Sequence, residues 1–184
     1  MLTLYLPEAE FFNEKTLEFI KRKEYTLTME HSLIAIFKWE EKFKKPFLDD
    51  KNNKSKKEMA YYYKCMTLTP NVPDELFEML FPNEENEIMS YITEDHTAST
   101  IKNDKKEGEA YNPKQFITSE LVYSWMCLNK IPKEYEKWHF SRLMILIRMV
   151  AEQKAPPKKK NHRQAARDYA AMNKARREKY HSKG

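Results

Sequence analysis

The chain has 184 residues, of which 41% are hydrophobic and 33% are charged. This composition excludes disorder throughout the chain, because the apolar residues are numerous enough to form a core, and the length fits one domain with an appendage. Only two glycines occur, Gly108 and Gly184, so neither a phosphate-binding loop nor a dinucleotide-binding turn is expected, since both need glycine where the backbone approaches the ligand.

The positive net charge of +5 is unevenly distributed along the chain. Residues 154–184 hold eleven Lys and Arg against Asp168 and Glu178, a net charge of +9, so residues 1–153 carry −4. The charge pattern indicates two parts. We expect residues 1–153 to form a mainly α-helical globular domain and residues 154–184 to form a basic appendage.

The first elements in chain order are strands followed by a helix. Apolar and polar residues alternate over residues 2–6 and again over residues 24–30, which predicts a small N-terminal β-hairpin. From residue 31 the apolar residues recur at intervals of three and four, which is typical of a helix, and Pro46 ends it. Residues 49–57 are polar and predict a loop.

Three further elements are expected before residue 118. A helix should bury Met59, Tyr62, Tyr63 and Met66 on one side, and a second helix over residues 73–81 should have Pro73 in its first turn. A short helix is predicted over residues 83–92. Residues 97–101 and 114–118 fit a second short β-hairpin around a charged loop.

Residues 118–154 give the strongest helical signal. One helix should be capped by Thr118 or Ser119, and another should begin at Pro132 and continue to Lys154. Apolar residues cover more than half the circumference of the second helix, so the sequence predicts a buried αα-hairpin at the centre of the core. A DNA-reading helix–turn–helix is disfavoured, because its second helix would have to expose a polar face.

No residue of the body has the spacing of a catalytic, cofactor or metal site. His139 and Arg142 fall within the apolar arc, and we expect them to bond a carboxylate such as Glu120 or Glu136 rather than to act as an acid/base pair. Asp95 and His96 are weak candidates for metal ligands, because the other histidines are scattered. The chain is therefore expected to be no enzyme and to carry no cofactor.

Two further features concern the compartment. Cys65 and Cys127 are far apart, and we expect two buried free thiols, as in a reducing cytosol. No run of 18 apolar residues occurs, so no membrane anchor is expected.

The basic appendage contains the candidate binding residues. Its first residues, "APPKKK", predict a semi-rigid spacer, and from Asn161 the sequence predicts a helix with a basic face beside an apolar face. Such a helix can follow phosphates, enter the groove of a partner or lie on an acidic protein surface, and the alternative is a solvated, mostly disordered tail. The residues predicted to bind a partner are Lys158, Lys159, Lys160, Arg163, Arg167, Tyr169, Met172, Lys174, Arg176, Arg177 and Tyr180.

Five segments carry a resemblance to a known family: "EHSLIAIFKWEEKFKKPF", "KCMTLTPNV", "ITSELVYSWMCLNKIP", "KWHFSRLMILIR" and "MNKARREKYHSKG". Together they cover most of the chain in order. The chain resembles a family encoded in the structural gene modules of long-tailed bacteriophages and related prophages, near the major tail and tape measure genes, where tail assembly chaperones occur.

The resemblance implies a non-enzymatic tail assembly chaperone in the cytoplasm of the host cell. Such a protein binds the tape measure protein and covers its long apolar helices until tail tube subunits polymerise around it. The resemblance supplies no catalytic residues. Two alternatives stay open: a structural component of the virion, in the tail or connector, and an accessory protein that binds nucleic acid through its basic C-terminal arm.

Overall fold

The computed structural model describes residues 1–184 except 14–16, 50–52, 100–115, 155–161 and 181–184. Helices dominate the described residues, and the strands form two small antiparallel sheets of two strands each, which confirms the mainly α class with small β-hairpins. The chain divides into two compact units, Met1–Ala151 and Glu152–Gly184, which are described separately.

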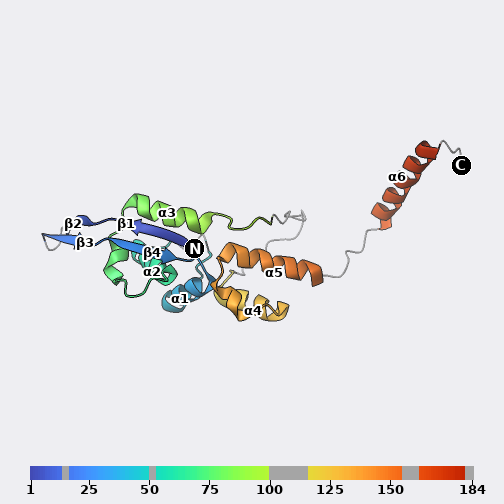
Figure 1. Ribbon diagram of the computed structural model, residues 1–184. Coiled ribbons are helices and arrows are strands. Elements are labelled where there is room, and N and C mark those ends of the chain that lie inside the picture. The colour runs from blue at the N-terminus through green and yellow to red at the C-terminus, as the bar shows by residue number, and fades with distance from the viewer. Residues whose placement is uncertain (14–16, 50–52, 100–115, 155–161, 181–184) are drawn as a thin grey trace. The chain divides into compact units, whose positions relative to one another are not determined.

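The strands form a long, interrupted β-ribbon. Strand β1 (Leu2–Leu6) pairs with β4 (Tyr25–Met29), as the alternation of the sequence predicts. Between them, β2 (Ala9–Asn13) pairs with β3 (Glu18–Arg22) and forms a second ribbon that was not predicted. Figure 1 shows this second ribbon extending beyond the helices at one end of the unit.

Two helices follow the strands where their periodicity predicts them. Helix α1 (Leu33–Phe43) ends at Lys44, whose φ of 55° is left-handed, before Pro46 can enter the helix. Helix α2 (Lys56–Met66) begins with a capping box, in which Ser55 and Glu58 each accept a hydrogen bond from the other's backbone N–H.

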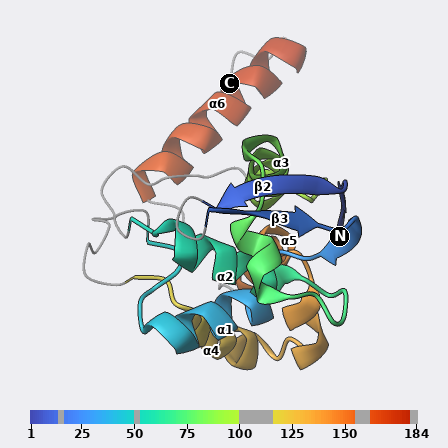
Figure 2. The ribbon, with the colours of Figure 1, turned by 90° about the vertical axis from the view of Figure 1, so that its left-hand side faces the viewer.

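A short 3₁₀ helix and a third α-helix complete the first half of the unit. The predicted helix over residues 73–81 is only a 3₁₀ segment, η1 (Asp74–Glu78), with Pro73 as its N-cap. Helix α3 (Pro82–Thr93) matches the predicted short helix. Figures 1 and 2 place α3 on one side of the strands and helices α1 and α2 on the other.

The larger hydrophobic core lies between these layers. The strands bury alternate leucine and methionine side chains, and the helices bury aromatic and branched side chains against them. Trp39 is completely buried and donates its indole N–H to the backbone carbonyl of Glu58 at 2.8 Å, which joins α1 to α2. The largest fully buried members are Leu4, Leu6, Leu27, Met29, Ile36, Trp39, Tyr62, Met66, Leu76 and Ile88.

Helices α4 (Ser119–Asn129) and α5 (Phe140–Lys154) form a smaller second core. Thr118 caps α4, as predicted. The helix predicted to begin at Pro132 is interrupted, because η2 (Lys133–Lys137) ends at the extended residue Trp138 and α5 begins only at Phe140.

The prediction that this hairpin forms the centre of the core is wrong. In α5 only Leu143 and Ile147 are buried, and Met149 is 39% exposed. The two buried residues pack with Leu33 of α1 and with Val122 and Met126 of α4. Apolar residues surround much of α5, but its neighbours cover a single stripe of positions four residues apart.

The second predicted β-hairpin lies largely outside the described residues. Its described ends, 97–99 and 116–118, form no strand. The predicted C-terminal helix is present as α6 (His162–Tyr180) in the second unit. Among the helices that the structure describes, none is long and apolar enough to cross a membrane.

Candidate functional site

Helix α6 carries most of the residues predicted to bind a partner. Lys158, Lys159 and Lys160 lie outside the described residues, and Arg163 lies in α6 without a described side chain. The other predicted residues are all exposed on this one helix: Arg167, Tyr169, Met172, Lys174, Arg176, Arg177 and Tyr180.

The exposed side chains of α6 form two faces. At about 100° per residue, Arg167, Lys174 and Arg177 share one side of the helix. Tyr169 and Met172 share the other side with Tyr180, and these three side chains are 65%, 49% and 70% exposed. Arg176 and Lys179 fall on this second side too, so its apolar surface is bordered by cations. A helix that leaves large apolar side chains in water at regular spacing has an apolar surface available for a partner.

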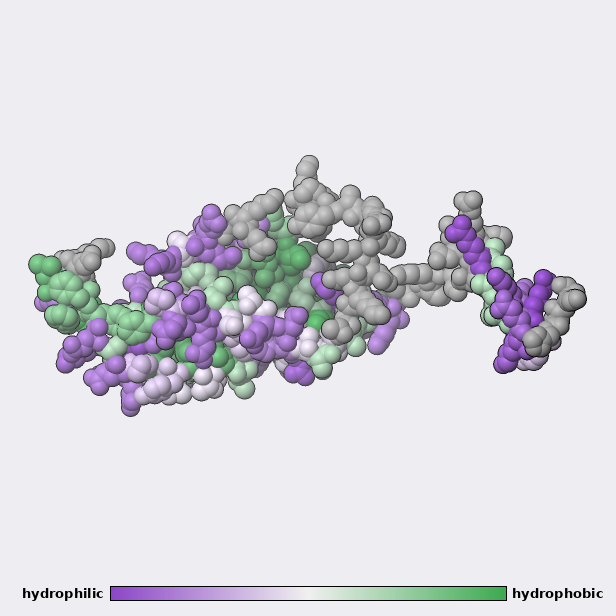
Figure 3. All heavy atoms as spheres, turned by 90° about the horizontal axis from the view of Figure 1, so that it is seen from above, coloured by the Kyte–Doolittle hydropathy of each residue, from purple (hydrophilic) through white to green (hydrophobic). Residues whose placement is uncertain are grey.

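A second exposed apolar surface is the ribbon of β2 and β3. Phe12 and Phe19 face each other across the strands, with ring centroids 5.2 Å apart, and both are more than half exposed. Figure 3 shows hydrophobic residues at this end of the unit, on the left of the view. An isolated two-stranded ribbon is marginally stable in water, so its base needs an anchor.

Arg22 is that anchor, and it is a feature that the sequence analysis missed. Its guanidinium is completely buried and makes two hydrogen bonds to the carboxylate of Glu84 in α3, at 2.7 and 2.8 Å. The same group donates to the backbone carbonyl of Pro7 and packs against the rings of Phe11 and Phe81. These contacts fix the ribbon to the helical layer.

Three histidines that are distant in sequence come together in space. The ring centroids of His139 and His96 are 4.1 Å apart, and those of His139 and His31 are 5.1 Å apart. The extended backbone around residue 139 brings them together, since the Phe140 N–H donates to the His31 carbonyl at 2.7 Å. Sequence spacing gives no sign of this cluster.

Two members of the cluster, His31 and His139, are buried, and His96 is half-buried. Burial, followed by the neighbouring His139 and His96, lowers the pKa of His31 to about 3, and burial also lowers the pKa of His139. His31 Nδ1 lies at hydrogen-bond distance from the Tyr62 hydroxyl. Within the described residues, no three His, Cys, Asp or Glu side chains are arranged to hold a metal ion.

Among the residues that the structure describes, neither His139 nor Arg142 forms the expected hydrogen bond to a carboxylate. His139 Nδ1 lies 2.8 Å from the Ser141 hydroxyl, while Arg142 is exposed and its guanidinium lies 4.1 Å from the Trp138 ring centroid. Glu136 instead accepts a hydrogen bond from the Tyr123 hydroxyl at 2.8 Å. The prediction failed because it placed His139 and Arg142 on one continuous helix, whereas the chain is extended between η2 and α5.

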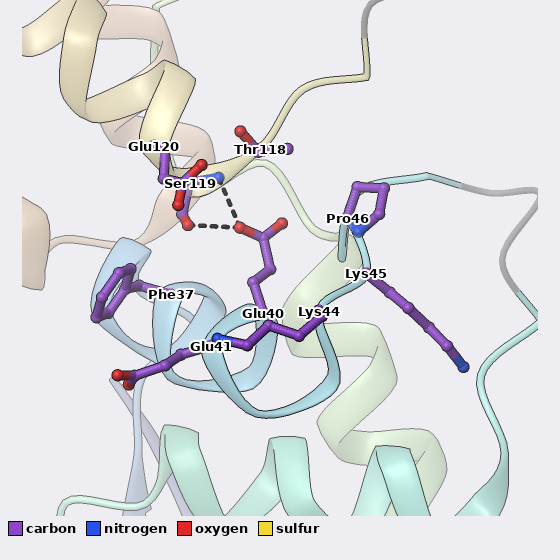
Figure 4. A pocket seen from close by; sticks show the side chains of 9 residues that line it. All are labelled: Phe37, Glu40, Glu41, Lys44, Lys45, Pro46, Thr118, Ser119 and Glu120. Carbon is purple, nitrogen blue, oxygen red and sulfur yellow. Dashed lines mark hydrogen bonds between the residues drawn. The ribbon is translucent and has the colours of Figure 1, made fainter.

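A pocket of about 460 Å³ lies between α1 and the start of α4 (Figure 4). One oxygen of Glu40 accepts hydrogen bonds from the Ser119 N–H and hydroxyl, at 2.8 and 2.5 Å, and the other oxygen accepts from the Phe47 N–H. Both oxygens are thus engaged in joining α4 and the turn after α1 to this helix. Ser119 therefore has a structural role, because it bonds the start of α4 to Glu40 of α1.

The two cysteines differ from the expectation of two buried thiols. Cys65 is half-buried, and burial raises the pKa of its thiol, whereas Cys127 is exposed on α4.

Comparison of the chain with protein-family models, with curated proteins and with solved structures found no match.

Proposed function

We propose that the protein is a non-enzymatic bacteriophage tail morphogenesis protein, a tail assembly chaperone that binds the tape measure protein through α6. The exposed amphipathic surface of α6 carries the proposal. Its Tyr169, Met172 and Tyr180 side chains would pack on apolar helices of the tape measure protein, and its basic face would pair with acidic side chains.

The need of a helix for packing contacts supports a binding role for α6. Most of the stability of a helix in a protein comes from packing of its amphipathic face, so packing against a partner would stabilise the 19 residues of α6. The second exposed apolar surface, at the ribbon of β2 and β3, gives the larger unit a further contact for an apolar partner. The host cell cytoplasm, where tails assemble, is the proposed compartment.

Replacing Tyr169, Met172 and Tyr180 together with alanine is expected to weaken binding of the tape measure protein at least about tenfold. Loss of three large side chains from the centre of an interface removes more than about 1.4 kcal/mol. Co-purification of the co-expressed tape measure protein, followed by titration of the purified pair, measures the loss. Leu128→Ala, at an exposed position of α4, is the control and should bind normally.

Charge reversal on the basic face distinguishes the chaperone from a nucleic-acid-binding protein. The triple variant Arg167→Glu, Lys174→Glu, Arg177→Glu should reduce binding of the tape measure protein. If these changes abolish salt-dependent binding to DNA and leave tape measure binding intact, the helix is a nucleic-acid arm and the proposal is wrong. If mass spectrometry of finished virions finds the protein in stoichiometric amounts, it is a structural component rather than a chaperone.

A further inference from the structure

A groove of about 510 Å³ lies at the histidine cluster, bordered by residues that follow β4 and by residues of α3, η2 and α5. Its buried lining includes Tyr91, His139 and Glu30. The Glu30 carboxylate is already engaged, because it accepts a hydrogen bond from the Tyr91 hydroxyl at 2.7 Å and pairs with the Met1 amino group at 3.0 Å. The inner end of the groove therefore presents partnered polar groups and aromatic rings.

The outer lining of the groove is apolar and cationic. Leu68 is 56% exposed, and Trp138, which also lines the groove, is partly exposed. Lys137 and Arg142 are both exposed, and within the described residues neither forms an ion pair. The contact of Arg142 with the Trp138 ring limits the freedom of its guanidinium.

The charge of the groove is opposite to that of the body around it. Residues 1–153 carry a net charge of −4, yet among the described residues Glu30 is the one acidic residue that lines the groove, and its charge is compensated. Lys137 and Arg142 are left to give the groove a positive potential. Such a site favours a negatively charged ligand, and its exposed apolar wall favours a ligand with an apolar side chain.

We propose that this groove binds an acidic segment of the tape measure protein that carries a large apolar side chain. The apolar side chain would lie against Leu68 and Trp138, and the carboxylates of the segment would pair with Lys137 and Arg142. This inference rests on the proposed function and adds the groove to the contacts already proposed for α6 and for the ribbon of β2 and β3.

Overlapping 20-residue peptides of the tape measure protein, labelled with fluorescein and titrated against the full chain, test the groove. The peptides that bind should include acidic ones with at least one large apolar residue. The double variant Lys137→Glu, Arg142→Glu should weaken their binding at least about tenfold, because two attractive charges become repulsive. The matched control is Lys133→Glu, Arg148→Glu, which changes the same net charge at exposed positions of η2 and α5 outside the groove.

The outcomes of these titrations distinguish failure of the groove proposal from failure of the proposed function. Equal loss of acidic-peptide binding in both double variants, or binding of basic peptides alone, would overturn the groove, while tape measure binding through α6 could still stand. Absence of tape measure binding by the unaltered chain and by every peptide would overturn both. A circular dichroism spectrum identical to that of the unaltered chain shows that each variant has folded.

Discussion

Arg22→Ala is expected to lower the free energy of unfolding by about 3–5 kcal/mol, the range for breaking a buried ion pair by removing one partner. The substitution leaves the Glu84 carboxylate, which is 5% exposed, buried without its cation. It also removes the hydrogen bonds to the carbonyls of Pro7 and Met79. The base of the ribbon formed by β2 and β3 then loses its ion pair with α3 and keeps the stacking of Phe11 on Phe81 there.

Urea denaturation followed by circular dichroism measures this loss. Lys21→Ala removes a neighbouring cation whose pair with Glu10 is exposed, and it should leave stability unchanged. The double variant Arg22→Met, Glu84→Leu should recover much of the lost stability, because it leaves no buried charge. A single-variant loss below about 1 kcal/mol would mean that water reaches the pair in solution.

Acidification from pH 7 to pH 5 is expected to remove about 2 kcal/mol of stability through His31 alone. The pKa of His31 is lowered from 6.5 to about 3 in the folded protein, so the unfolded chain takes up the proton first. The stability that depends on neutral His31 is therefore fully present above pH 6.5 and is lost as the pH falls toward 3. The lowered pKa of His139 adds to the loss in the same direction.

The pH dependence of unfolding in the variant His31→Gln isolates this contribution. The variant should be less stable at pH 7, because burial and the contact with Tyr62 are disturbed. Between pH 7 and pH 5, however, it should lose about 2 kcal/mol less than the unaltered chain. Parallel curves for the two proteins would show that His31 is accessible to protons in the folded state.

The sequence predicted those features that are determined locally. The alternation of Leu2, Leu4 and Leu6, the cap at Thr118 and the stop before Pro46 all depend on neighbouring residues, and all are found in the structure. The basic amphipathic pattern likewise predicted α6. In each case local hydrogen bonding or periodicity decides the structure.

Features that depend on contacts between distant residues were not predictable. The Arg22–Glu84 pair joins residues 62 positions apart, and the cluster of His31, His96 and His139 depends on the break before α5. The ribbon of β2 and β3 was missed because apolar residues are adjacent there, as at Phe11 and Phe12, instead of alternating with polar ones. Arg142 was predicted to lie in a buried apolar arc because the helix was assumed to be continuous from Pro132 to Lys154.

The solubility of the tape measure protein on co-expression tests the central claim most directly. The full chain should keep the tape measure protein soluble and should elute with it as one complex in size-exclusion chromatography. A chain that ends at residue 153 should leave the tape measure protein in the insoluble fraction. Equal amounts of soluble tape measure protein with the full chain, with the shortened chain and with neither would contradict the proposed chaperone function.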